Sequence, residues 1–129
     1  MEEKHFTENR VTYRKHLSQP WFDLISSGTK IWEGRLRKGD FLKIKTGDVV
    51  IWYNESKEVK TKITDVKMYE SFNRGIEELG LENVLPTEFD LNKTIDQAVE
   101  DVYYKYFNRE EELKFTTVFF KISVLNEKF

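Results

Sequence analysis

The chain has 129 residues, of which 39% are hydrophobic and 15% aromatic, and its formal net charge is −2. A chain of this length suits one domain, which buries roughly two-thirds of the surface that the unfolded chain exposes. The absence of cysteine excludes disulfides and thiolate metal sites, and no apolar run approaches the roughly 20 residues that a membrane-spanning helix needs. Because residues 1–5 also lack the apolar stretch of a secretory signal, we expect one soluble, cytoplasmic domain over residues 1–129.

The first predicted elements are two strands that flank a short helix. Residues 11–17 alternate apolar with polar side chains, which predicts a strand. Ser18 is expected to cap a helix that begins by Pro20, because serine is a preferred N-cap and proline fits the first turn. Gly28 stands where a left-handed C-terminal cap is needed. A second strand is predicted at 30–37.

The middle of the chain predicts a hairpin. Residues 41–45 suggest a short extended piece, and residues 45–48 suggest a turn. The continuous apolar run at 49–53 is typical of a strand buried on both faces. Residues 54–57 are polar enough to turn the chain, and residues 59–69 alternate again and predict the returning strand.

A short helix and a loop are predicted next. Ser71 is a suitable N-cap for a helix whose apolar residues fall on one face, and Gly80 is expected to end it. We expect a loop through Pro86 and Asp90.

The last part of the chain predicts a helix, a loop and a strand. Thr94 and Gln97 have the spacing of a capping box, and the helix from residue 95 has an apolar stripe. The acidic stretch 110–112 is expected to be a solvated loop, and a final strand is predicted at about 115–124. These elements predict the α+β class, with a mixed β-barrel of five to six strands and two or three helices.

Charge is distributed unevenly along the sequence. Residues 28–45 contain six basic side chains against two acidic ones, whereas residues 77–112 contain eleven acidic side chains against three basic ones. Two readings of these blocks stay open: two solvated faces, or an edge that accepts a polyanion. The acidic block also leaves open a protein–protein adaptor that meets a basic partner.

The residues best suited to bind a ligand or to catalyse a reaction lie where the second predicted strand follows the first predicted helix. In an extended strand Glu33 and Arg35 lie on the same face, about 7 Å apart, close enough to pair or to hold a ligand. Lys30 lies at the bend, where it can point into a cleft as a hydrogen-bond donor or base. Alternatively, Glu33 and Arg35 form an ion pair that closes the barrel while Lys30 is solvated.

The spacing Gly28-x-Lys30-x-x-Glu33-x-Arg35 resembles the GxKxxExR motif of the ASCH family, named for activating signal cointegrator homology. Other segments resemble the same family in order: 45–51, 68–72, 80–86 and a tyrosine-rich helix before the last strand. The resemblance implies a PUA-like mixed β-barrel with a cleft beside the first helix. It also implies a superfamily whose members commonly bind RNA or modified nucleobases.

From this resemblance we expect an RNA- or nucleotide-binding domain. Lys30 and Arg35 would contact phosphate or base oxygens, and Glu33 would accept hydrogen bonds or orient the arginine. Lys43 and Lys45 would meet a polyanion. Two further candidates, Trp32 and Trp52, either stack on a base, which contributes roughly 1–3 kcal/mol per base, or belong to the core.

An enzyme is the alternative. Some small ASCH proteins resemble N4-acetylcytidine amidohydrolases, which use a lysine of this motif, a threonine three residues later and a downstream glutamate. Lys30 matches that lysine and Glu82 is a candidate for the glutamate, but Glu33 stands in place of the threonine. Because a carboxylate does not replace a hydroxyl nucleophile without a change of chemistry, Lys30 and Glu33 would act as acid and base on an acylated nucleoside or on RNA.

The sequence predicts no metal or other cofactor. His5 and His16 are not at a metal-ligand spacing, and no cysteine completes a ligand set. The glycines are too scattered for a phosphate-binding loop. The expected partners are RNA or a modified nucleoside or nucleotide, with no membrane, and the protein is expected to be a monomer or a weak homodimer.

Overall fold

A five-stranded mixed sheet organises the protein, as a computed structural model that describes residues 11–126 shows. The strand order is β1-β3-β4-β5-β2, in which β1 and β3 run parallel and the other neighbours run antiparallel. The strands are β1 (Thr12–His16), β2 (Trp32–Leu36), β3 (Val49–Asn54), β4 (Lys57–Tyr69) and β5 (Thr117–Val124). His5 lies outside the described residues.

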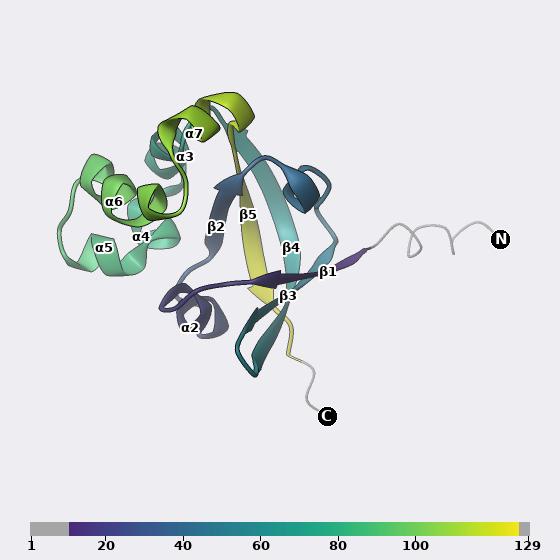
Figure 1. Cartoon of the computed structure of the whole chain (residues 1–129). Coiled ribbons are helices and arrows are strands. Elements are labelled where there is room, and N and C mark those ends of the chain that lie inside the picture. Colours follow the sequence, from purple (N-terminus) through teal and green to yellow (C-terminus); the bar gives the residue numbers. More distant parts are fainter. Residues whose placement is uncertain (1–10, 127–129) are drawn as a thin grey trace.

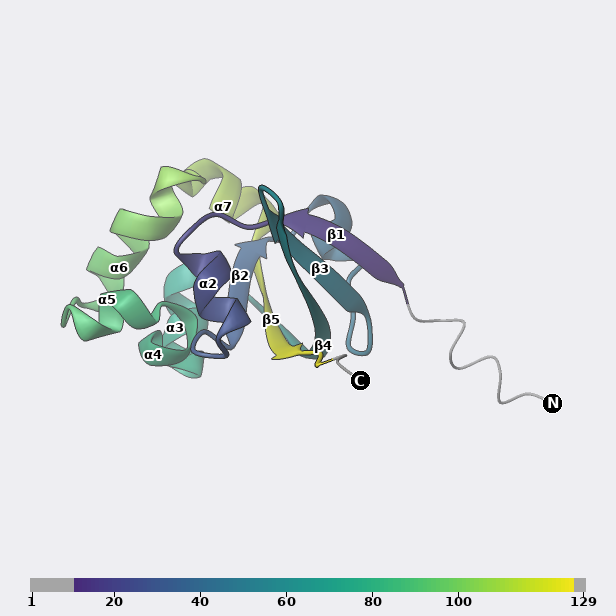
Figure 2. The ribbon, with the colours of Figure 1, turned by 90° about the horizontal axis from the view of Figure 1, so that it is seen from below.

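The helices are short and gather mostly on one side of the sheet. Figures 1 and 2 show α3 to α7 together, and Figure 1 shows α2 near the start of β2. The helices are α2 (Trp21–Ser26), α3 (Phe72–Leu79), α4 (Leu81–Val84), α5 (Pro86–Asp90), α6 (Ile95–Val102) and α7 (Arg109–Phe115), with 3₁₀ turns η1 (Gly39–Leu42) and η2 (Tyr103–Lys105). No helix among the described residues is both long and apolar enough to cross a membrane.

The sheet is curled, so that its two edge strands approach one another. β1 and β2 are at opposite ends of the strand order, yet Arg35 on β2 donates a hydrogen bond of 3.1 Å to the carbonyl oxygen of His16 on β1. The α+β class with a barrel-like mixed sheet is therefore confirmed. Within the described residues the sheet has five strands.

Phe119 fixes the helical layer to the sheet. Its ring is wedged between two glycines: a Cβ atom at Gly34 on β2 would lie 2.6 Å from the ring, and one at Gly75 on α3 would lie 2.3 Å from it. Both distances are shorter than any ordinary carbon contact, so only glycine allows this approach. The ring also meets the edges of Phe72 and Tyr69.

Several predicted elements are confirmed. Ser71 caps α3 through the N–H of Arg74, and Gly28, with φ +83°, follows the C-terminus of α2 in the left-handed region. The capping box of Thr94 and Gln97 opens α6.

Other predicted elements are wrong. Residues 41–45 are not extended, because η1 and the turn after it occupy this segment. Ser18 does not cap α2 with its side chain, and instead its carbonyl oxygen accepts the N–H of Phe22. The predicted loop through Pro86 contains α4 and α5.

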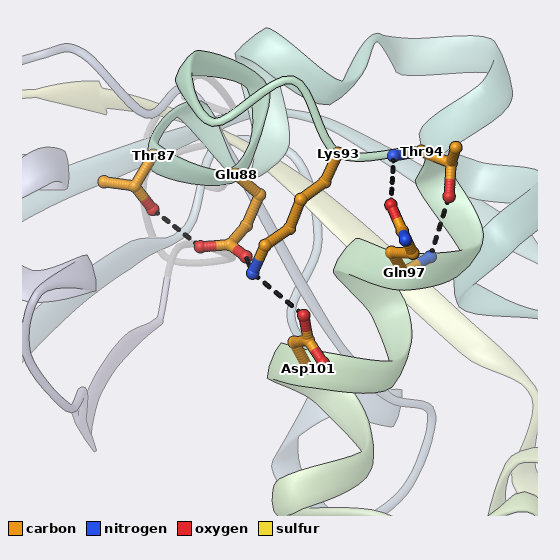
Figure 3. A network of polar contacts seen from close by, with 6 residues as sticks. All are labelled: Thr87, Glu88, Lys93, Thr94, Gln97 and Asp101. Carbon is orange, nitrogen blue, oxygen red and sulfur yellow. Dashed lines mark hydrogen bonds and ion pairs between the residues drawn. The ribbon is translucent and has the colours of Figure 1, made fainter.

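The short helix α5 is held by an ion-pair network. Figure 3 shows Lys93 between Glu88 of α5 and Asp101 of α6, at 2.6 Å and 2.9 Å. Thr87 donates a further hydrogen bond to Glu88. The network joins α5 to the last turn of α6, a contact that no local sequence pattern predicts.

The acidic stretch 110–112 is helical, not a loop. Asn108 and Glu111 form a capping box that opens α7. Glu112 is buried, where it accepts hydrogen bonds from the N–H of Phe72 at 2.8 Å and from the hydroxyl of Tyr104 at 2.6 Å. This carboxylate therefore ties α7 to the start of α3.

Candidate functional site

A cavity of about 370 Å³ lies where β2 meets the end of β1, the start of α2 and the η2 turn. This volume falls at the small end of the roughly 300–1,000 Å³ that ligand pockets occupy. The three charged residues of the motif all line it, together with a set of aromatic side chains: Trp21, Phe41, Tyr103, Tyr106 and Phe107. The fold thus brings the motif into one concave site.

Lys30 is fully engaged inside this site. Its side chain lies at the end of the loop after α2, and the residue is 2% exposed. The ammonium donates to the carbonyl oxygens of Trp32, at 2.8 Å, and of Val84, and it pairs with Glu33 Oε1 at 3.3 Å. An ammonium has three N–H donors, so this set satisfies it. Burial lowers the pKa of Lys30, and the charge of Glu33 offsets this only in part.

Glu33 is buried between two cations. Its Oε1 faces Lys30, and its Oε2 accepts a hydrogen bond of 2.7 Å from Arg35 Nε. Burial alone raises the pKa of the Glu33 carboxyl, but the two cations outweigh burial and hold that pKa below its usual value. Glu33 is therefore an ionised group that orients Arg35.

Arg35 presents the free donors of the motif. Its guanidinium lies over the rings of Phe41 and Trp52, at 4.9 Å and 5.4 Å from the ring centroids. Of five N–H groups, one binds Glu33 and one binds His16. The other three have no hydrogen-bond partner within residues 11–126, so Arg35 has donors available for a ligand.

Tyr103 adds a second polar group. The residue is 5% exposed, and its buried hydroxyl has no hydrogen-bond partner of normal geometry in the described part of the chain. The hydroxyl lies over the β2 backbone, 2.9 Å from where a Cβ of Gly34 would be. Burial raises the pKa of Tyr103 well above its usual value, and Glu33 adds to this shift. The backbone N–H of Gly34 opposes part of this shift as a donor to the oxygen, so it is the O–H that lacks an acceptor. The group stays protonated, and a buried O–H without an acceptor costs about 1–3 kcal/mol.

Aromatic rings form the walls and the rim. Trp21 and Phe107 are mostly buried, whereas Tyr106 is 55% exposed at the rim. The sequence reasoning did not single out Trp21, Tyr103, Tyr106 or Phe107 as site residues. The tyrosine-rich segment before the last strand is the one local signal that pointed toward Tyr103 and Tyr106.

The remaining candidates lie elsewhere. Gly28 is exposed and does not line the cavity. Trp32 and Trp52 are buried outside its lining, and Trp52 donates its indole N–H to Thr61. Both belong to the core, although the ring of Trp52 packs against the guanidinium of Arg35.

Three more candidates are also outside the cavity. Lys43 and Lys45 line a neighbouring hollow, and Glu82 is exposed on α4 and lines neither. No group of three His, Asp or Glu residues that could hold a metal ion occurs within residues 11–126.

A curled mixed sheet that presents a Lys-Glu-Arg cluster to a cavity beside a short helix is the arrangement of a PUA-like domain. The family model described as "ASCH domain" matches residues 16–122, so the chain belongs to the ASCH domain family. The resemblance stated from the motif is thereby confirmed.

Two solved structures support this assignment. The crystal structure of hypothetical protein PH0355 has 32% sequence identity and a TM-score of 0.79, and the match covers 88% of this chain and 99% of that one. The solution NMR structure of protein PF0455 from Pyrococcus furiosus has 31% identity and a TM-score of 0.71, over 88% of this chain and 97% of that one. A search of curated proteins gives no significant match.

Proposed function

We propose that the protein binds a nucleobase, in RNA or in a modified nucleoside or nucleotide, inside the cavity of the motif. The observation that carries this proposal is the combination of free donors on Arg35, an unpaired buried hydroxyl on Tyr103 and aromatic walls in a volume of about 370 Å³. Base recognition in single strands uses these same parts: stacking on aromatic rings and hydrogen bonds to base edges.

Each residue type has a distinct task in this proposal. Arg35 donates to base or phosphate oxygens, and Tyr103 donates to an acceptor on the buried edge of the base. Glu33 holds the guanidinium in place, because its Oε2 accepts the Nε hydrogen bond. Lys30 positions Glu33 and connects β2 to α4, since its three donors are occupied within the protein.

Hydrolysis of an acylated nucleoside has less support from this geometry. The Lys30 ammonium has no lone pair to take a proton from water, and all three of its N–H groups are engaged, so none is left to stabilise an oxyanion. Glu82, the candidate second carboxylate, is exposed on α4 away from the cavity. The binding role is therefore the better account of these residues.

Titration calorimetry with the four nucleoside 5′-monophosphates, cytidine and N4-acetylcytidine tests the proposal. We expect measurable binding, with each ligand recovered unchanged by chromatography. Tyr106→Ala removes an exposed aromatic ring from the rim and should weaken binding by about 1–3 kcal/mol, the contribution of one stacked base.

Phe89→Ala is the matched control, because Phe89 is a half-exposed aromatic residue on α5 outside the cavity. This variant should bind as tightly as the parent. Absence of binding to every ligand, or equal affinities for the two variants, would overturn the proposal. Release of cytidine from N4-acetylcytidine would replace binding by hydrolysis.

A further inference from the structure

A second hollow of about 470 Å³ adjoins the cavity of the motif. Phe41, in the η1 turn, lines both. The basic residues of the second hollow are Arg37, Lys43 and Lys45, and no acidic residue among residues 11–126 lines it. Leu42 and Met68, both more than half exposed, supply apolar surface. The two hollows thus meet at one aromatic side chain.

Two cations of the second hollow are not used within the described chain. Lys45 pairs with the buried carboxylate of Asp48 at 3.3 Å, so its charge is largely matched. By contrast, the exposed side chains of Arg37 and Lys43 form no direct hydrogen bond or ion pair within residues 11–126. Lys43 acts on Asp40 only at longer range: the hydrogen bond from Lys15 does most to lower the pKa of that carboxyl, and the charge of Lys43 adds to the shift. In a protein of net charge −2, unmatched cations next to exposed apolar side chains favour an anionic partner with apolar faces.

Phe41 is a fixed platform between the hollows. Its ring packs on Phe120 with centroids 5.9 Å apart. The Arg35 guanidinium lies 4.9 Å from the centroid of the Phe41 ring, and the Lys15 ammonium lies 5.2 Å from it. Lys15 is in turn held by Asp40 at 2.7 Å. A chain that leaves the cavity here passes a supported aromatic ring with Arg35 beside it.

We propose that the two hollows form one track for single-stranded RNA, with one base in the cavity and the adjoining phosphates over Phe41 toward Arg37 and Lys43. This inference rests on the proposed function. A base that enters a cavity must be unpaired and out of the stack, which excludes a continuous duplex. A groove that combines cations along the backbone with aromatic or apolar platforms is how proteins follow a single strand.

Fluorescence anisotropy with labelled hexanucleotides rC6, rU6 and rA6, compared with the nucleoside 5′-monophosphates, tests the track. The tightest hexanucleotide should bind the parent protein at least tenfold more tightly than its monophosphate at low salt. Each phosphate contact makes the fall of the logarithm of the affinity with the logarithm of the salt concentration steeper by about 0.7 for single strands. The double variant Arg37→Gln/Lys43→Gln should therefore make this salt dependence shallower by about 1.4, and its affinity for cytidine, which carries no phosphate, should stay within twofold of the parent.

Lys121→Gln is the control for charge, because Lys121 is exposed on β5 and lines neither hollow. It should leave the hexanucleotide affinity unchanged. The track is overturned if hexanucleotide and monophosphate bind equally, or if the double variant behaves like Lys121→Gln. In both cases the binding of monophosphates would still support the cavity.

Four further outcomes also test the track. Loss of hexanucleotide affinity in both Tyr106→Ala and the double variant supports one continuous track. A loss in the double variant alone overturns it, because the cavity is then no part of the path. Equal binding of a DNA hexanucleotide or of an RNA duplex overturns the assignment to single-stranded RNA, and absence of binding to all probes overturns the cavity and the track together.

Discussion

Replacing Lys30 by methionine tests whether this lysine holds the site together. Lys30→Met keeps the length of the side chain and removes the ammonium. Among the described residues, the change leaves the buried Glu33 paired with Arg35 alone, and it leaves the carbonyl oxygens of Trp32 and Val84 without this donor.

The expected loss follows from these contacts. Removing one partner of a buried ion pair costs about 3–5 kcal/mol, and an unsatisfied buried carbonyl costs about 1–3 kcal/mol. These costs do not simply add, because all three groups share one ammonium. The variant also avoids the cost of burying a charge, which is the desolvation that lowers the pKa of Lys30 in the parent protein. We therefore expect a net loss of about 3 kcal/mol, a large part of the 5–15 kcal/mol typical of a whole domain.

Urea denaturation at pH 7, followed by tryptophan fluorescence, measures this loss. Lys43→Met is the control, because Lys43 is exposed and should change the unfolding free energy by no more than about 0.5 kcal/mol. A loss below about 1 kcal/mol for Lys30→Met would refute the positioning role. The burial of Lys30 would then need another explanation, and a catalytic role for this lysine would regain support.

Further predictions concern packing, a buried carboxylate and pH. Gly75→Ala should lower the unfolding free energy by about 1–3 kcal/mol, although alanine favours helices, because its Cβ would lie 2.3 Å from the ring of Phe119; an unchanged urea midpoint would contradict this packing. Burial and the hydrogen bond to Glu112 raise the pKa of Tyr104 to about 12, so Glu112→Gln should lower it in an ultraviolet titration, and an unmoved pKa would argue against the bond. Because the folded-state pKa of Glu33 is depressed, its stabilisation is present above the unfolded-state pKa of about 4.3 and is lost as the pH falls through the folded-state value. Urea unfolding between pH 7 and pH 3 should show a shallower pH dependence in Glu33→Gln, and equal slopes would contradict the ion pairs.

Periodic and capped elements were predictable from the sequence because their signals are local. The hairpin of β3 and β4 follows from a continuous apolar run and an alternating segment on the two sides of a polar turn. The Thr94 capping box and the left-handed Gly28 follow from residue types at fixed offsets.

The missed helices depend on contacts between distant residues. Glu112 lies in a run of three acids that reads as solvated, yet its carboxylate accepts the N–H of Phe72, forty residues earlier. The helix α5 depends in the same way on Lys93 reaching Glu88 and Asp101. Neither set of contacts joins residues close enough in the sequence to produce a recognisable local pattern.

In the candidate site, too, the residues with a local signal were predictable and those that depend on distant contacts were not. The motif pointed to Glu33 and Arg35 because strand parity puts both on one face. The satisfied ammonium of Lys30 was not predictable, since one of its acceptors is the carbonyl of Val84, 54 residues away. Tyr103 and Tyr106 also reach the cavity from a distant segment.

A crystal structure with the tightest-binding hexanucleotide tests the central claim most directly. The account predicts one base inside the cavity, against its aromatic wall, with hydrogen bonds from Arg35 and from the Tyr103 hydroxyl to base or phosphate oxygens. It also predicts that Lys30 keeps its bonds to Trp32, Val84 and Glu33. RNA bound elsewhere on the protein while the cavity holds no base would contradict the account.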